Sequence, residues 1–552
     1  MGAAQVAPCN QPTKQEFRSK MKIVLAEKVS PATLAVLKSE PDWQILTHDQ
    51  ITSLPEALAD ADGLVVRSAV QVDDALMASA PRLRVIGRAG VGVDNIDADA
   101  ATRRGIVVMN TPGANAVAVA ELTIALMLAL GRMLPKANAT MHAGKWEKKS
   151  LQGTELRGKK LGILGLGRIG LEVARRARSF GMELIGHDPF VSAAVARENA
   201  IRLVTVDELF RESDYLTLHV GLTPQTAGII NEKTIASMKK GVRIINCARG
   251  ELIAEEALAE ALKSGHVAGA ALDVFHQEPP KDSPFFPLEN VLLTPHIAGS
   301  TAEAQEAVGV QIALQVREYL KLGVVQNAVN LPSLSHEEYL EVAPYIEMAG
   351  RLGTFLAQFP ESGIESIELS YSGRIAEGKT ELIRNSAIAG ILGHSESVNR
   401  INAAAIAAER GIRIHEEKKE ASNGGAGSVL KLTLHTPNSD FTASATVLHG
   451  ISARLLSLDG IDIEAPLQGA LLTIHNRDVP GVIGRVGTIL GDHRVNIANF
   501  ALGRSDRSQR VPQGNALAVV QIDGTIADAA LEELRAVEAI LQVHLVNLNG
   551  EK

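Results

Sequence analysis

A chain of 552 residues is too long for a single hydrophobic core, so several domains are expected. Its 55 basic and 63 acidic residues are interspersed and leave a net charge of −8, which argues against a nucleic-acid partner and favours small molecules. Two cysteines are too few for a disulfide framework, so we expect a reducing compartment, with the cytoplasm as the default.

The N-terminal 20 residues contain two prolines and mixed polar side chains, without the apolar segment of a signal peptide. We therefore predict a disordered tail over 1–20, with Met21 as a natural start. The most apolar stretch, 114–130, is interrupted by Glu121 and is too short for a membrane span. This pattern predicts a buried helix and no membrane partner.

Short apolar strands alternate with helical patterns from residue 21 to about 118, which is typical of a parallel α/β sheet. We predict strands at 22–26, 64–66, 85–88 and 107–109, and helices near 31–39 and 72–78. A helical pattern at 302–322 closes this domain, so a substrate-binding domain is predicted over 21–118 and 301–330.

Two arginines follow strands of this first domain. Arg67 closes one strand, and Arg88 closes another just before a glycine loop that contains Gly90, Val91 and Gly92. Ligands of open α/β sheets bind beyond the carboxyl ends of the strands, so these five residues are candidates for binding an anionic substrate. Ordinary surface ion pairs are the alternative interpretation of the arginines.

A glycine motif forms the centre of the second domain. An apolar strand at 161–164 runs into Gly-Leu-Gly-Arg-Ile-Gly at 165–170, and a basic helix follows. In a dinucleotide site these glycines allow a tight turn, approach of the backbone to a pyrophosphate and close helix packing. Another strand ends at Asp188, where a ribose-binding acid belongs, whereas an isolated glycine motif could be an ordinary turn.

Strand patterns at 160–164, 183–187, 215–219, 242–246, 268–272 and 291–294 predict a doubly wound nucleotide-binding domain over 119–300. The apolar helix at 112–130 is expected to cross between the two domains. Three of the later strands are followed by Arg249, Glu278 and His296, which should converge on the crevice that holds the dinucleotide.

The motifs at 165–170, Asp188, Arg249, Glu278-Pro279 and Thr294-Pro295-His296 together resemble the NAD-dependent D-2-hydroxyacid dehydrogenase family. The resemblance implies NAD as cofactor, hydride transfer at a 2-hydroxyl carbon and no metal. It implies these cofactor contacts: Gly165, Gly167, Arg168, Ile169, Gly170, Asp188, Thr223, Cys247, Ala248, Asp273, Ala298 and Gly299. The chain departs from the family at Gly221, where proline is usual, and at Ala298-Gly299, which replaces Gly-Ala.

The resemblance also assigns catalytic roles. His296 would be the general base, Glu278 would orient and charge its ring, and Arg249 would bind the substrate carboxylate. A satisfied structural histidine is the alternative for His296. Cys247 is interpreted as a small packing residue rather than a nucleophile, and Asp188 should favour NAD over NADP.

The chain continues for more than 200 residues beyond a simple dehydrogenase. An intervening domain over 331–467 is predicted, with a helix at 344–359, a strand at 364–371, an alanine-rich helix near 380–408 and an exposed loop at 422–427. It contains no catalytic constellation, and a structural spacer is the plain interpretation, although it resembles an allosteric-substrate-binding domain.

The last segment, 468–552, follows a β-α-β-β-α-β pattern and resembles the ACT regulatory domain, which pairs between subunits. We predict strands at 471–475, 495–500, 516–522 and 543–548 and helices after Pro480 and at 527–541, the first with Ile483 on its apolar face. By resemblance, Asn476, Asp478 and Asn496 are effector-binding candidates, and L-serine is the expected effector. Helix capping is the alternative for Asn476 and Asp478.

The combined order of domains resembles the long form of the D-3-phosphoglycerate dehydrogenase family, which implies oxidation of 3-phosphoglycerate in serine synthesis. A glyoxylate or hydroxypyruvate reductase would share the catalytic triad but normally lacks the C-terminal domains. An NAD-sensing corepressor would match only the first two-thirds. A homo-oligomer is expected, with a tetramer favoured by analogy.

Overall fold

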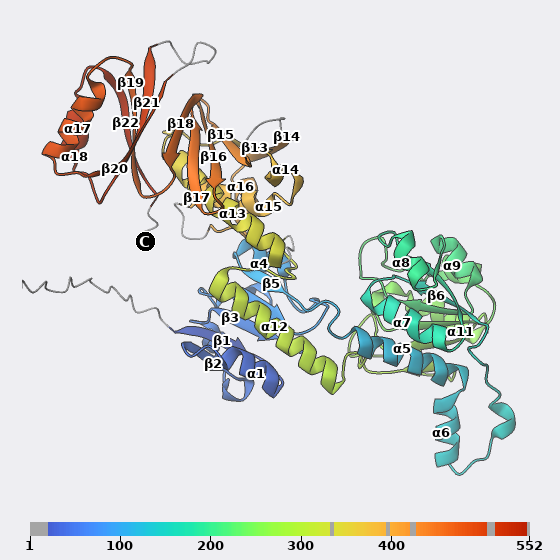
Figure 1. Cartoon of the computed structure of the whole chain (residues 1–552). Coiled ribbons are helices and arrows are strands. Elements are labelled where there is room, and N and C mark those ends of the chain that lie inside the picture. The colour runs from blue at the N-terminus through green and yellow to red at the C-terminus, as the bar shows by residue number, and fades with distance from the viewer. Residues whose placement is uncertain (1–19, 332–335, 394–397, 420–426, 505–513, 549–552) are drawn as a thin grey trace, which may run out of the picture.

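The computed structural model describes residues 20–331, 336–393, 398–419, 427–504 and 514–548. Most of the predicted tail and residues 422–426 of the predicted loop lie outside these ranges. The strands in the described ranges form four sheets, shown along the chain in Figure 1. Two are wholly parallel, one is mixed and the last is antiparallel, which confirms the predicted fold class.

The first sheet is parallel, with the order β2-β1-β3-β4-β5. Its strands are β1 (Met21–Leu25), β2 (Trp43–Leu46), β3 (Gly63–Val66), β4 (Val85–Arg88) and β5 (Val107–Met109), and its helices are α1 (Pro31–Lys38), α2 (Leu54–Leu58), α3 (Asp74–Ala78), α4 (Ala98–Arg103) and α12 (Ala302–Leu322). A side chain at Gly87 would meet Ile312 at 2.8 Å, which shows how closely α12 packs on β4. The returning helix therefore completes the core of the first domain.

The second sheet is parallel, with the order β12-β11-β10-β9-β6-β7-β8. Its strands are β6 (Lys160–Leu164), β7 (Glu183–His187), β8 (Arg202–Leu203), β9 (Tyr215–Leu218), β10 (Val242–Asn246), β11 (Val267–Leu272) and β12 (Val291–Leu293). The helices are α5 (Ala116–Gly131), α6 (Leu134–His142), α7 (Arg168–Ser179), α8 (Ala193–Glu198), α9 (Val206–Glu212), α10 (Glu232–Ser237) and α11 (Glu255–Lys263). The strand order reverses beside β6, which places the expected ligand crevice above the end of that strand.

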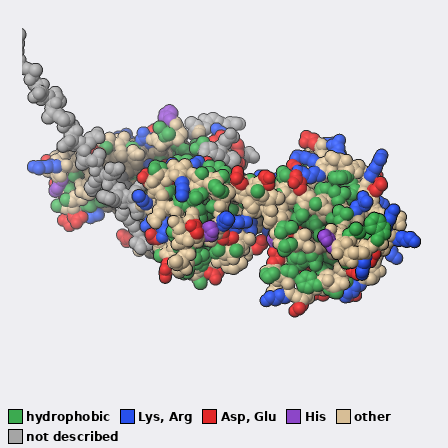
Figure 2. Space-filling view, turned by 90° about the horizontal axis from the view of Figure 1, so that it is seen from below, with side chains coloured by type: hydrophobic (Ala, Val, Ile, Leu, Met, Phe, Trp, Pro, Cys, Tyr) green, Lys and Arg blue, Asp and Glu red, His purple; other side chains and the backbone are tan. Residues whose placement is uncertain are grey.

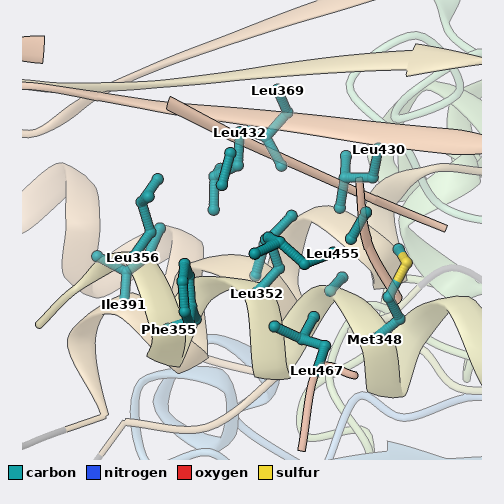
Figure 3. Close-up of a cluster of buried hydrophobic side chains, with 14 of the residues drawn as sticks. Met348, Leu352, Phe355, Leu356, Leu369, Ile391, Leu430, Leu432, Leu455 and Leu467 are labelled. Carbon is teal, nitrogen blue, oxygen red and sulfur yellow. The ribbon is translucent and has the colours of Figure 1, made fainter. Parts of the chain in front are cut away.

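The third sheet has the order β14-β13-β15-β16-β17-β18, and its core forms where leucines of the strands meet Leu352 and Phe355 of α13 (Figure 3). Its strands are β13 (Ser366–Ser372), β14 (Arg413–Lys419), β15 (Val429–His435), β16 (Asp440–Leu448), β17 (Ser452–Leu458) and β18 (Ile461–Pro466). The helices are α13 (His336–Leu356), α14 (Arg374–Glu377), α15 (Glu381–Leu392) and α16 (Ala403–Glu409).

The prediction of one alanine-rich helix over 380–408 was wrong, because α15 ends at Leu392 and α16 begins at Ala403. Asn399 accepts a hydrogen bond from the backbone N–H of Ile401 at 2.8 Å. Asparagine side chains that bond to nearby backbone stabilise turns in place of helix, which explains the break.

The fourth sheet is antiparallel, with the order β20-β21-β19-β22. It consists of β19 (Ala470–Arg477), α17 (Val482–Asp492), β20 (Ile497–Arg504), β21 (Asn515–Ile522), α18 (Asp528–Arg535) and β22 (Ile540–Asn547), the predicted β-α-β-β-α-β order. Three details differ from the prediction. Pro480 precedes the N-cap Gly481, Ile483 is 49% exposed, and α18 stops at Arg535, so that residues 540 and 541 belong to β22.

The four sheets form an extended arrangement in Figure 1, with the second at one end, the fourth at the other, and the first and third between them. Two chain segments join the first and second sheets, one before α5 and one before α12. Within the described ranges, no single helix has the length and apolar composition to cross a bilayer, and only the bent pair α5 and α6 meets that test jointly.

Candidate active site

A cavity of about 650 Å³ lies where the first and second sheets face each other. Six predicted site residues line it: Arg67, Arg88, Gly90, Glu278, His296 and Gly299. The first three belong to one domain and the others to the second, so the cavity depends on both halves. Arg249 and the glycine motif are not among its lining residues.

His296 and Glu278 form a hydrogen-bonded pair within this cavity. The Nδ1 atom of His296 lies 2.6 Å from Oε2 of Glu278, whose Oε1 accepts a hydrogen bond from the N–H of Phe275 at 3.1 Å. The carboxylate is therefore fixed at the end of β11 and orients the imidazole ring. Because Nδ1 bonds to Glu278, Nε2 is the ring nitrogen left for the predicted proton exchange.

Asp273 holds the turn that carries His296. Its buried carboxylate accepts hydrogen bonds from Thr294 Oγ1 at 2.5 Å and from the N–H groups of Ile297 and Ala298 at 2.9 Å each. The backbone of His296 has a φ of 52°, a conformation that is uncommon outside glycine. Asp273, a predicted cofactor contact, thus supports the turn that carries His296.

Two glycines of the loop after β4 make room for two guanidinium groups. A side chain at Gly90 would lie 1.8 Å from Nη1 of Arg88, and one at Gly92 would lie 1.9 Å from Nη2 of Arg249. Burial and the nearby Arg249 lower the pKa of Arg88. The loop therefore brings two cations together, as an anionic ligand requires.

Arg249 crosses from the second domain to the first. Its Nη2 lies 3.2 Å from Oδ2 of Asp94, a residue that lines the cavity. The side chain of Asn246 donates to the carbonyl of Arg249 at 2.8 Å and its Oδ1 accepts from the N–H of Ala248, which fixes the turn after β10. The predicted arginine is thus held beside the cavity, and Asn246 is a positioning residue that sequence reasoning missed.

The glycine motif has the geometry of a dinucleotide site. Gly165 has a φ of 94°, and a side chain at Gly170 would lie 2.1 Å from the carbonyl oxygen of Gly165. In contrast, a side chain at Gly167 would meet nothing within 4 Å, so open space lies over the N-terminus of α7. The three predicted glycines therefore provide the tight turn, the close helix packing and the open approach for a pyrophosphate.

Asp188 lies against this motif, since its Oδ2 accepts a hydrogen bond from the N–H of Leu166 at 2.8 Å. Its Oδ1 accepts from the N–H of Phe190, whose ring is 95% exposed. This exposed aromatic residue, two positions from the predicted ribose-binding acid, was not among the predicted site residues. Arg168 reaches the carbonyl of Pro112, so the motif also contacts the segment that joins the domains.

The remaining cofactor candidates occupy the surrounding turns. Thr223 bonds to Thr226 in an exposed loop, Ala298 is buried, and Ile169 is half-buried in α7. Burial raises the pKa of the Cys247 thiol to about 12, which agrees with packing rather than nucleophilic chemistry. Val91, a substrate-binding candidate, accepts a hydrogen bond at its carbonyl oxygen from the side chain of Asn110.

Relatives share this architecture along nearly the whole chain. A D-3-phosphoglycerate dehydrogenase of Methanocaldococcus jannaschii is 40% identical over 531 residues, which cover 96% of this chain and 100% of the relative. Another, of Bacillus subtilis, is 38% identical over 529 residues, covering 96% and 99%. The chain belongs to the D-3-phosphoglycerate dehydrogenase family.

Domain families match in the order that this membership requires. The NAD-binding domain of D-isomer specific 2-hydroxyacid dehydrogenases matches residues 124–298, the D-3-phosphoglycerate dehydrogenase intervening domain matches 341–459, and the ACT domain matches 470–539. A D-lactate dehydrogenase structure from Aquifex aeolicus, complexed with NAD and lactic acid, has a TM-score of 0.50, is 28% identical, and covers 56% of this chain and 100% of its own. NAD is therefore the cofactor, and the predicted resemblance is confirmed.

The effector candidates of the ACT domain do not meet within one chain. Asn476 pairs with Ala516 near one end of the sheet, whereas Asn496 precedes the pair Ile497 and Ile522 at the other end. Six residues of strand separate these ends, roughly 20 Å. Asp478 is paired with Arg504 at 3.2 Å, and Asn496 donates to Asp523 at 2.6 Å.

Proposed function

We propose that the chain oxidises 3-phosphoglycerate to 3-phosphohydroxypyruvate with NAD, the first step of serine biosynthesis. The observation that supports this most directly is a single cavity in which the His296–Glu278 pair faces Arg67 and Arg88. A proton acceptor and two cations suit a substrate that carries a hydroxyl and an anionic group.

Each residue then has a separate task. Arg249 binds the substrate carboxylate after leaving Asp94, and Arg67 and Arg88 bind the phosphate. His296 accepts the proton of the 2-hydroxyl at Nε2, while Glu278 stabilises the imidazolium that forms. NAD, when bound, would supply the acceptor for the hydride of the same carbon; Gly165–Gly170 would hold its pyrophosphate and Asp188 its ribose.

Steady-state turnover tests this proposal. Oxidation of 3-phosphoglycerate and of D-glycerate is measured with NAD and with NADP, and reduction of glyoxylate with the reduced form of each cofactor. We expect kcat/KM for 3-phosphoglycerate to exceed that for D-glycerate by about 10²-fold, since an anion pocket discriminates against a ligand that lacks the anion. Preference for glyoxylate, or equal use of NADP, would contradict the substrate or the role of Asp188.

We also propose that the chain forms a homo-oligomer, with a tetramer as the favoured size. Leu134 and Met141 of α6 and the following Trp146 are exposed by 52%, 56% and 79%. Figure 2 shows hydrophobic side chains gathered on the lobe that contains the second sheet, viewed from the side where Figure 1 places α5 and α6. Such a surface is typical of a subunit contact.

Feedback inhibition by L-serine forms a third part of the proposal. Because Asn476 and Asn496 lie at opposite ends of one sheet, a site that uses both must include a second copy of the chain. We propose that two ACT domains pair so that one supplies Asp478 and Asn476 and the other Asn496. The alternative role of Asp478, helix capping, is not supported, because its side chain contacts Arg504.

Serine at millimolar concentration is expected to lower turnover of the wild type at least several-fold and to raise its melting temperature, since binding stabilises the native state. Asp478→Asn should weaken both effects by about 10-fold through loss of a charge-assisted contact. Arg477→Gln, a neighbouring change outside the set, is the matched control. Absence of any serine effect on the wild type in both measurements would contradict this part.

A further inference from the structure

The loop after β3 carries Arg67 into the cavity, together with Ser68 and Gln71. The guanidinium of Arg67 contacts the carbonyl of Lys28 at 3.3 Å through Nη1. A long side chain with so weak a contact takes its position from the backbone that bears it. The residues that hold this loop therefore matter for the placement of the cation.

Glu27 holds the loop from one side. Its Oε1 accepts hydrogen bonds from the N–H groups of Arg67 at 2.8 Å and Val70 at 3.3 Å, and its Oε2 accepts from Ala69 at 3.4 Å. A carboxylate close to an anion site is electrostatically unfavourable for the ligand. Its presence here is explained by these contacts to the loop backbone.

Asn95 holds the same loop from the other side. Its amide Nδ2 donates to the carbonyls of Arg67 at 3.0 Å and Val70 at 2.7 Å, and only 8% of the residue is exposed. Its own carbonyl accepts from the N–H of Val72 at 2.8 Å. Glu27 therefore accepts hydrogen bonds from N–H groups of the loop, and Asn95 donates hydrogen bonds to its carbonyl groups.

Asn95 also joins this loop to the second cationic loop. It follows Asp94, which contacts Arg249, and lies just beyond Gly90 and Gly92, on which two guanidinium groups rest. A shift of Asn95 would therefore change the separation between Arg67 and the Arg88–Arg249 pair. Misplacement of a binding group by about 1 Å can cost a factor on the order of 10² in rate.

We propose that Glu27 and Asn95 are positioning residues that set where Arg67 meets the phosphate of the substrate, and thereby determine the preference for a phosphorylated hydroxy acid. This inference rests on the proposed function and adds two residues to it that act through the backbone of the loop that bears Arg67, one of which, Asn95, also lines the cavity.

The test measures kcat/KM for 3-phosphoglycerate and for D-glycerate in the wild type, Asn95→Ala and Glu27→Ala. We expect each variant to lose about 10- to 100-fold with 3-phosphoglycerate, mainly through KM, and less than about 3-fold with D-glycerate. Asn95→Ser, which keeps one donor, should lose less than Asn95→Ala. The KM for NAD should stay unchanged.

A thermodynamic cycle separates positioning from general stability. In the Arg67→Ala background, Asn95→Ala should change kcat/KM by less than about 2-fold, because it acts through the missing guanidinium. Asn330→Ala is the matched control, since that amide also bonds to backbone and side chains of the first domain at Ile106, Val108 and Thr102, away from the loop. It should lower the melting temperature without changing the substrate ratio.

The outcomes are distinct. A wild type that does not prefer 3-phosphoglycerate refutes the proposed function. A wild type that prefers it, with an unchanged ratio in both variants or a full effect of Asn95→Ala in the Arg67→Ala background, refutes the positioning role alone.

Discussion

Replacing His296 with alanine is expected to lower turnover by a factor of about 10² to 10⁴ while NAD still binds. The imidazole is the group that can take the hydroxyl proton, and its Nδ1 is already committed to Glu278 at 2.6 Å. Steady-state turnover and the Kd for NAD, measured on the same preparation, check the two parts of this expectation.

His276→Ala is the matched control. This neighbouring histidine is exposed and is not among the residues that line the cavity, so its loss should leave turnover within about 2-fold of the wild type. Turnover of His296→Ala close to that of the wild type would remove His296 from the mechanism. Equal losses in both variants would point to the fold of this segment rather than to catalysis.

Two glycine substitutions in the same motif should separate cofactor binding from folding. Gly167→Ala is expected to weaken NAD binding on the order of 10²-fold, since a methyl group would stand where the pyrophosphate meets the helix N-terminus. Stability should remain within about 0.5 kcal/mol, because φ is −69° and nothing lies within 4 Å of the added carbon.

Gly170→Ala should behave differently. Its added carbon would lie 2.1 Å from the carbonyl oxygen of Gly165, which is backbone and cannot turn aside, so α7 must shift. We expect a loss of about 1–3 kcal/mol in the free energy of unfolding, along with weaker NAD binding. Thermal unfolding without cofactor and titration with NAD check both variants. Equal stability of the two would contradict the assignment of Gly170 to helix packing.

The parts of the fold that could be predicted are those in which local chemistry is sufficient. Buried parallel strands such as β6 and β10 are continuous apolar runs between polar turns, and they occur where expected. The edge strands β2 and β8 were missed because they are half-exposed or only two residues long, so their sequences lack a clear period. The break between α15 and α16 depends on an asparagine turn that alanine content conceals.

The site divides in the same way. Arg249, Glu278 and His296 could be predicted as catalytic residues because each follows a strand and matches a motif of the family that the chain resembles. In contrast, the side chains of Asn95 and Glu27 bond to backbone groups 25 to 43 positions away, and no local sequence pattern predicts such contacts. The effector residues, which stay a prediction, show a different limit: motif positions that suggest one site lie at opposite ends of the sheet within one chain.

The sequence by itself determined the class of fold and the order of domains, because strand periodicity and glycine spacing are local properties, while the family resemblance predicted the nucleotide site and the acid–base pair. Only the tertiary structure showed which side chains share a cavity. It also showed that Asp273 supports the turn of His296 and that two glycines leave room for two arginine side chains. Those relations depend on distances between segments far apart in the chain, which are fixed only when the sheets pack and the returning helix α12 closes the first domain.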